Sequence, residues 1–121
     1  NGFVINLGID FSIVPLPGYQ GKEVLARCII RLKQLFDIDK WQFNEPIFTG
    51  NVATELDKVE GVQTVVDLQF HCKYDRKSGY SGNFYDIPSA TKNKIIYPSQ
   101  DPAIFEVKFP DKDIRGKVVS Y

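Results

Sequence analysis

The feature that most constrains the fold is a change of apolar period within residues 49–70, across a single glycine. The first half repeats at helical spacing, which predicts a short helix whose apolar face consists of Val52, Leu56 and Val59. We expect Thr49 to cap the start of this helix. We expect Gly61 to follow its end in a left-handed conformation, which glycine adopts without a Cβ clash.

The second half alternates with a period of two, which predicts a long strand. The side expected to face the core carries Val62, Thr64, Val66, Leu68, Phe70 and Cys72. The other side is polar, and Val65 is its one apolar exception. A helix that returns directly into a strand is a packing unit and contains no group of catalytic residues. It therefore favours a role in protein assembly over a role in catalysis.

Residues 3–14 alternate in the same way and predict another long strand, which ends at the Pro/Gly turn of residues 15–18. Residues 22–36 then show the helical period, and their apolar residues fall within an arc of roughly 140°. Ile30 lies outside that arc, on the outer face of the predicted helix with Arg27 and Arg31. We therefore include these three residues in a candidate interface.

Residues 74–102 show neither period, and Gly, Ser, Asn, Asp and Pro separate their aromatic residues. We interpret them as an ordered arm, because long structureless loops are uncommon in compact domains and aromatic residues supply burial energy. We expect the arm to pack on another chain; the alternative is a loop folded against its own domain. The candidate interface residues are Tyr80, Phe84, Tyr85, Ile95, Ile96, Tyr97, Arg27, Ile30 and Arg31.

The predicted fold class is α+β: a small mixed sheet of long strands, two helices packed on one face, the aromatic arm and a C-terminal β-hairpin. The proposed division is a core of residues 1–73, the arm of residues 74–102 and the hairpin of residues 103–121, within one domain. Gly116 suggests a bulge or a close backbone approach in the hairpin. The predicted core contains Phe3 or Ile5, Leu7, Ile9, Leu25, Cys28, Ile29, Leu32, Leu56, Val66 and Leu68.

The residues that could carry chemistry do not form a site. His71 and Cys72 are neighbours on a predicted strand and face opposite sides, so they cannot form a catalytic pair. One histidine and two cysteines cannot supply the four ligands of a zinc site. Asp111 and Asp113 lack the rest of a calcium loop and predict a polar turn. We predict no catalytic, metal or cofactor-binding residues, and Cys28 and Cys72 as free thiols.

Composition limits the classes of partner. Fifteen acidic and fifteen basic residues give a net charge of zero, which argues against a nucleic-acid partner. No apolar run approaches the length that spans a bilayer, so we expect no membrane partner. The sequence contains no methionine and starts inside a predicted strand, and we interpret it as a piece of a longer protein.

Four short motifs, taken in order, carry a resemblance to a known family. They are Asn-Glu-Pro-Ile at residues 44–47, Val-Glu-Gly-Val at residues 59–62, and the segments at residues 90–99 and 101–107. In this order, with the strand and helices around them, they resemble the C-terminal region of phage baseplate wedge proteins, in the form found in large T4-like phages. That family belongs to the baseplate J-like group of contractile tails, and the resemblance covers nearly the whole chain.

The resemblance implies a structural protein that is not an enzyme. It implies a place in the virion, in the phage tail baseplate, after assembly in the host cytoplasm. The expected partners are other copies of the chain and neighbouring baseplate proteins, with no small-molecule ligand. The alternative function is an α+β module that binds RNA or a small molecule through its sheet face, which would require stacking aromatics beside basic residues on that face.

Overall fold

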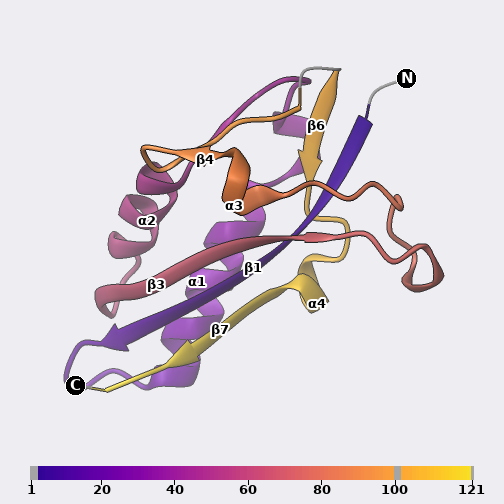
Figure 1. The fold of residues 1–121 in the computed structure, drawn as a ribbon. Helices are drawn as coiled ribbons and strands as arrows, with labels where there is room; N and C mark the ends of the chain where they lie inside the picture. The colour runs from indigo at the N-terminus through magenta and orange to yellow at the C-terminus, as the bar shows by residue number, and fades with distance from the viewer. Residues whose placement is uncertain (1–2, 100–101, 121) are drawn as a thin grey trace.

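The computed structural model describes residues 3–99 and 102–120. Its main sheet has β1 in the centre, β3 along one side of β1, and both β6 and β7 along the other (Figure 1). The bounds of these strands are Phe3–Pro15 for β1, Val62–Lys73 for β3, Ala103–Glu106 for β6 and Ile114–Val118 for β7. A smaller sheet has the order β2-β5-β4, with bounds Ile47–Phe48, Ile95–Ile96 and Thr91–Lys92.

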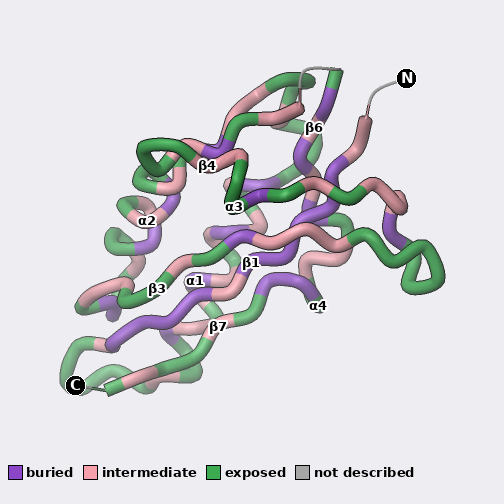
Figure 2. Tube along the Cα trace, viewed as in Figure 1, coloured by how far each residue is buried: buried purple, intermediate pink, exposed green. Residues whose placement is uncertain are grey.

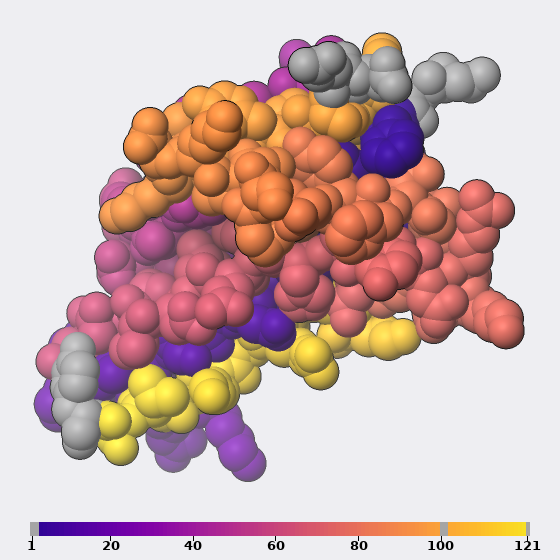
Figure 3. All heavy atoms as spheres, viewed as in Figure 1, coloured from indigo at the N-terminus to yellow at the C-terminus, as the bar shows by residue number. Residues whose placement is uncertain are grey.

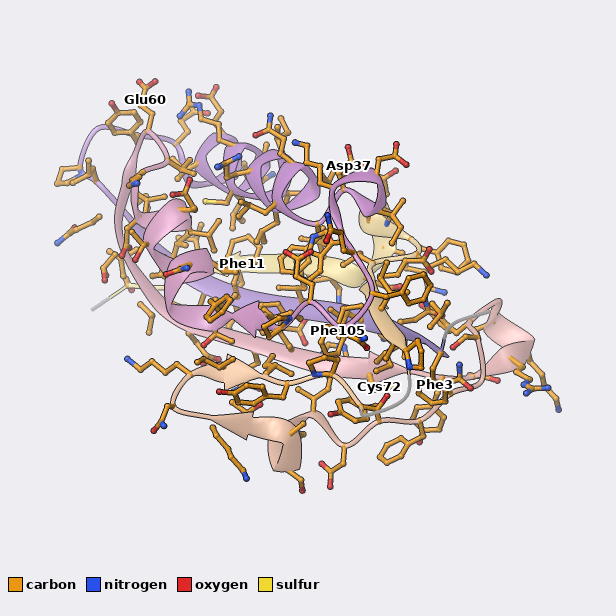
Figure 4. All side chains as sticks on the ribbon, turned by 90° about the horizontal axis from the view of Figure 1, so that it is seen from above. Phe3, Phe11, Asp37, Glu60, Cys72 and Phe105 are labelled. Carbon is orange, nitrogen blue, oxygen red and sulfur yellow. The ribbon has the colours of Figure 1, made fainter. Side chains whose placement is uncertain are left out.

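The predicted α+β architecture is confirmed, since helices pack against the main sheet. The two longer helices, α1 (Gly21–Leu35) and α2 (Thr49–Asp57), pack together with the buried face of the main sheet in one core. Seen from above, α1 lies on one side of β1 and β3, and the arm lies on the other (Figure 4). The short helices are α3 (Ile87–Ala90) and α4 (Pro110–Asp113), with 3-10 turns η1 (Ile38–Lys40) and η2 (Arg76–Ser78).

Strand β1 is the most deeply buried element of the main sheet (Figure 2). The predicted core face of β1 is confirmed, since its odd-numbered residues from 5 to 13 are all 2% exposed or less. On its other side Asn6, Ser12 and Val14 are buried as well. Helix α1 lies where it was predicted and buries Val24, Cys28 and Leu32 completely. Leu25 and Ile29 pack at the margin of the core and are only partly buried. The buried stripe of α1 is therefore narrower than the apolar arc in its sequence.

The predicted face of β3 is wrong at Val66, which is 52% exposed. The register with β1 shifts between the pairs Ser12–Asp67 and Ile13–Val65, so Val66 is an extra residue in β3. This β-bulge restarts the alternation and turns Val65, the apolar exception in the sequence, towards the core. Leu68, Phe70 and Cys72 keep their predicted side and pack against the core.

The junction between α2 and β3 differs in part from the prediction. Gly61 has a φ of 94°, as predicted, but α2 already ends at Asp57, so this glycine belongs to the following turn and not to the helix cap. Thr49 is not the N-cap residue, because the helix begins at Thr49 itself. The Thr49 hydroxyl instead donates to the carbonyl oxygen of Lys94 at 2.9 Å, in the turn between β4 and β5.

The two strands predicted near the C-terminus are present, and they extend the sheet. Each pairs with β1 in parallel: β6 lies along Phe3–Asn6, and β7 lies along Ile9–Ile13. Helix α4 separates them, so they follow one another along one side of β1 and do not pair with each other as the strands of a hairpin would. Gly116 is a close-approach position, because a Cβ there would lie 2.3 Å from Cζ of Phe11.

Candidate functional site

The arm was the predicted contact surface, and its first anchor is Tyr80. The Tyr80 hydroxyl lies 2.8 and 2.7 Å from the two carboxylate oxygens of Asp113, and both residues are buried. Burial raises the pKa of Tyr80 to about 12, and the hydrogen bond to Asp113 adds to this effect. The ammonium of Lys73 lies 4.0 Å from the same carboxylate. Tyr80 thus fixes the arm to α4, and its assignment to an interface is wrong.

A second anchor joins the arm to the start of β1, where β3 no longer pairs with it. The carbonyl oxygen of Val4 accepts hydrogen bonds from the Ser81 hydroxyl and the Asn83 side-chain amide, both at 2.9 Å. The backbone N–H of Ser81 donates to the side-chain oxygen of Asn6, whose amide nitrogen donates to Glu106 at 2.7 Å. These bonds satisfy a buried asparagine and an otherwise unpaired strand carbonyl.

The second half of the arm also folds against its own domain. Ile96 is 1% exposed and pairs with Ile47 in the small sheet, so it is unavailable to a partner. Tyr85 is half-buried beside Phe105, with ring centroids 6.2 Å apart, and its hydroxyl donates to the carbonyl oxygen of Tyr97. The alternative interpretation of the arm, a segment folded on its own domain, is therefore correct for these residues.

Part of the predicted interface remains exposed. Phe84 is 61% exposed, and its ring packs edge-on against Tyr74, which is 51% exposed, with centroids 5.0 Å apart. Tyr97 is 45% exposed. Ile95 is half-buried and is paired with the exposed Phe48, on the side of the small sheet opposite its buried residues. The arm thus presents aromatic side chains outward while its anchors face the domain.

The outer face of α1 contains an exposed Ile30 between two arginines that already have partners. Arg31 forms an ion pair with Glu55 of α2 at 2.6 Å, and this interaction holds the pKa of Glu55 below its usual range. Arg27 donates to the carbonyl oxygen of Glu60 at 3.3 Å. Both arginines therefore help to join α1 to the α2–β3 unit, and Ile30 is the residue of this group most open to a partner.

Tyr74, Phe43, Phe48 and Val66 are exposed apolar residues that were not assigned to the interface. The exposure of Phe48 could have been predicted, because Phe48 follows Ile47 in a short extended segment and adjacent side chains of a strand face opposite sides. Val66 could not have been found, because its exposure results from the bulge. Tyr74 directly follows the end of β3, and no pattern in the sequence predicts its contact with Phe84.

The face of the main sheet opposite α1 and α2 is polar, and we refer to it as the open face. His71 lies over Gly8 on this face, and its Nδ1 is 3.5 Å from a carboxylate oxygen of Asp10. Arg115 approaches the other carboxylate oxygen of Asp10 at 3.5 Å. Partial burial lowers the pKa of His71, and the charge of Asp10 opposes that shift. The His71–Asp10 pair is typical of a side-chain contact at a protein surface and not of a site that transfers protons.

The cysteines are separate, as predicted. Cys28 is buried in α1, and burial raises the pKa of its thiol to about 11. The thiol of Cys72 contacts the carbonyl oxygen of Asn83 in the arm (Figure 4). Within residues 3–99 and 102–120, no cluster of three or more acidic, histidine or cysteine side chains could hold a metal ion. No helix in this part of the chain is long and apolar enough to cross a membrane.

No protein-family model, no curated protein and no solved structure matches this chain. Three features define the candidate site: an arm with buried polar anchors, aromatic side chains exposed on that arm, and an edge of the main sheet at β3. Among the described residues this outer side of β3 has no strand partner.

Proposed function

We propose that this domain is a structural assembly module of a phage tail baseplate, which contacts other copies of itself and neighbouring baseplate proteins. The observation that carries the proposal is the Tyr74–Phe84 pair, two aromatic rings packed on each other while each is more than half exposed. Aromatic residues held in place at a surface are the typical anchors of protein interfaces, because little conformational entropy is lost when a partner covers them.

The resemblance to baseplate wedge proteins supplies the biological setting of this proposal, and the ordered arm supports it. Hydrogen bonds at Ser81 and Asn83 fix the segment that leads to Phe84, so its ring is presented on a rigid support. The alternative, RNA binding through the sheet, has less support because the hollow around Asp10, Asp67 and Arg115 offers no ring on which a base could stack: its one aromatic residue, Phe11, is 2% exposed.

The association test uses the double variant Tyr74→Ser and Phe84→Ser. Because both side chains are exposed, we expect the variant to fold as the parent does, with an unchanged circular dichroism spectrum. Sedimentation velocity should show weaker self-association or weaker binding to co-expressed baseplate neighbours. Ile38→Ser is the matched control, since it removes a 40% exposed apolar side chain from the 3-10 turn after α1.

The location test uses antibodies raised against the domain. On particles that carry the parent protein, electron microscopy should show the label at the baseplate end of the tail. Labelling elsewhere, or association that the double variant leaves at full strength while Ile38→Ser weakens it, would contradict the proposal and its choice of surface.

A further inference from the structure

The outer side of β3 is an open strand edge. Among the described residues β1 is the only strand that pairs with β3, and beyond Val62 no bond between backbone groups joins β3 to any element other than β1. The N–H of Val65 is satisfied by the carboxylate of Asp57 at 3.2 Å, at the end of the edge near α2. The following residues present backbone groups that a further strand could use, as open sheet edges do in strand-addition complexes.

A groove of about 390 Å³ runs along this edge between β3 and the β4–β5 turn (Figure 3). Residues 65–68 form one wall, Lys94 forms the other, and the first turns of α2 form the floor. The floor residues Gly50 and Ala53 are small, and a Cβ added to Gly50 would have no atom within 4 Å. The groove therefore has room for the side chains of an extended segment.

The two walls carry opposite charges. Asp67 and Lys94 are both exposed, and neither forms an ion pair within the described part of the chain. The turn that carries Lys94 is fixed, because the Lys94 carbonyl oxygen accepts from both the N–H and the hydroxyl of Thr49 at 2.9 Å. A segment that adds to β3 thus meets a cationic side chain on its α2 side and a carboxylate on the polar side of the sheet.

We propose that this groove binds an extended segment of a partner polypeptide, which adds to β3 as a new edge strand. Its acidic side chain pairs with Lys94, and the apolar side chain two residues later lies over Gly50 and Ala53 on the same side of the strand. The next side chain is basic and points to the opposite, polar side of the sheet, where it pairs with Asp67. Four residues of strand span about 13 Å, so the segment is short. This inference rests on the proposed assembly function and adds to it the mode of contact and the charge pattern of the partner.

The probe is the peptide Glu-Thr-Val-Lys-Val, in which Glu and the first Val face one side of the strand and Lys faces the other. It is joined to the C-terminus of the domain by a flexible Gly/Ser linker of about 25 residues. Such a linker reaches roughly 28 Å and gives a millimolar effective concentration, so that weak binding is detected. Hydrogen exchange followed by NMR should show the outward-facing amides of residues 66–68 exchanging roughly tenfold more slowly than in the same chain with the linker alone. The charge-swapped probe Lys-Thr-Val-Glu-Val should give less protection.

Two substitutions in α2 test whether the protection comes from this groove. Gly50→Leu fills the floor without backbone strain and should abolish the protection, whereas Asn51→Leu adds the same side chain to an exposed neighbour outside the groove and should preserve it. Both variants should retain the circular dichroism spectrum of the parent. No slowing at residues 66–68 with either probe, or equal slowing in Gly50→Leu, would overturn the proposal.

Failure of the groove proposal can be distinguished from failure of the assembly function. If the Tyr74/Phe84 double variant loses association while the tethered probe leaves β3 unprotected, the domain assembles without strand addition and only the groove proposal fails. If β3 is protected but neither self-association nor binding to neighbours is found, the groove binds peptides and the baseplate function fails.

Discussion

The core of residues 3–73 and the arm, described over residues 74–99 and at residue 102, are both ordered, but different interactions hold them. In the core, the odd-numbered residues of β1 from 5 to 13 and three residues of α1 are almost completely buried apolar side chains. In the arm, Ile87 and Ile96 are also buried, but the first half is fixed by polar contacts: Tyr80 on Asp113, and Ser81 and Asn83 on the carbonyl oxygen of Val4. Apolar burial is spread over many residues, whereas the polar contacts concentrate at a few.

Because the interactions differ, we expect the two regions to respond differently to substitution. A core position loses transfer free energy in proportion to the atoms removed, and the cost is predictable from burial. An arm anchor that is removed leaves its buried partner without a hydrogen bond, and that cost depends on one contact. The predictions below test this contrast, from the largest expected effect to the smallest.

Gly61→Val should have the largest effect, because Gly61 lies at the junction of the two core elements α2 and β3. Its φ of 94° is unfavourable for valine, and the new Cβ would lie 2.7 Å from side-chain atoms of Tyr19 and Val24. Strain and overpacking together should cost roughly 2–6 kcal/mol, measured by urea unfolding. Gly50→Ala is the control, and it should stay within about 1 kcal/mol of the parent. Equal effects at the two glycines would contradict the strain argument.

Leu32→Ala tests the apolar half of the comparison directly. Leu32 is completely buried in α1, so its truncation should reduce the free energy of unfolding by about 2–5 kcal/mol. Ile30→Ala on the same helix should change it by less than about 0.5 kcal/mol, since Ile30 is 55% exposed. A loss below about 0.5 kcal/mol for Leu32→Ala would mean that this helix face contributes little to the core.

The same contrast explains how much of the structure could be predicted from the sequence. Periodicity located β1, α1, α2 and β3, because long elements with one buried face leave a regular apolar pattern. It failed at Val66, where a bulge changes the face without changing the composition. It also failed to reveal the arm anchors, because a contact such as Tyr80 with Asp113 joins residues far apart in sequence and belongs to no period.

The candidate surface was predicted only in part for the same reason. Aromatic content correctly suggested that the arm is ordered, but it could not separate Tyr80, which is 8% exposed, from Phe84, which is 61% exposed. Only the tertiary structure distinguishes an anchor from an exposed ring. A variant with all the arm aromatics replaced by serine would therefore unfold the arm as well as change its surface, which is why the association test is restricted to Tyr74 and Phe84.

Tyr80→Phe tests the polar half of the comparison with the loss of one oxygen atom. The phenylalanine ring keeps the apolar contacts, but Asp113 remains buried without this donor, so the free energy of unfolding should fall by roughly 1–3 kcal/mol. Tyr97→Phe removes the same atom from a 45% exposed ring of the arm and should have no measurable effect. Similar small changes in both variants, measured by urea unfolding, would show that the arm is held by apolar contacts after all.

Lys94→Gly should have the smallest effect, and its sign is opposite. The β4–β5 turn has positive φ at both central residues, 53° at Asn93 and 63° at Lys94, as the common two-residue hairpin turn requires. Asparagine adopts this conformation at a lower cost than lysine, so glycine at position 94 should stabilise the domain by about 1 kcal/mol after the loss of chain entropy is counted. Asn93→Gly, the control, should gain less. If Lys94→Gly destabilised the domain in thermal unfolding, the lysine side chain would have to make a stabilising contact that outweighs its backbone strain, and the arm would then depend on more than its polar anchors.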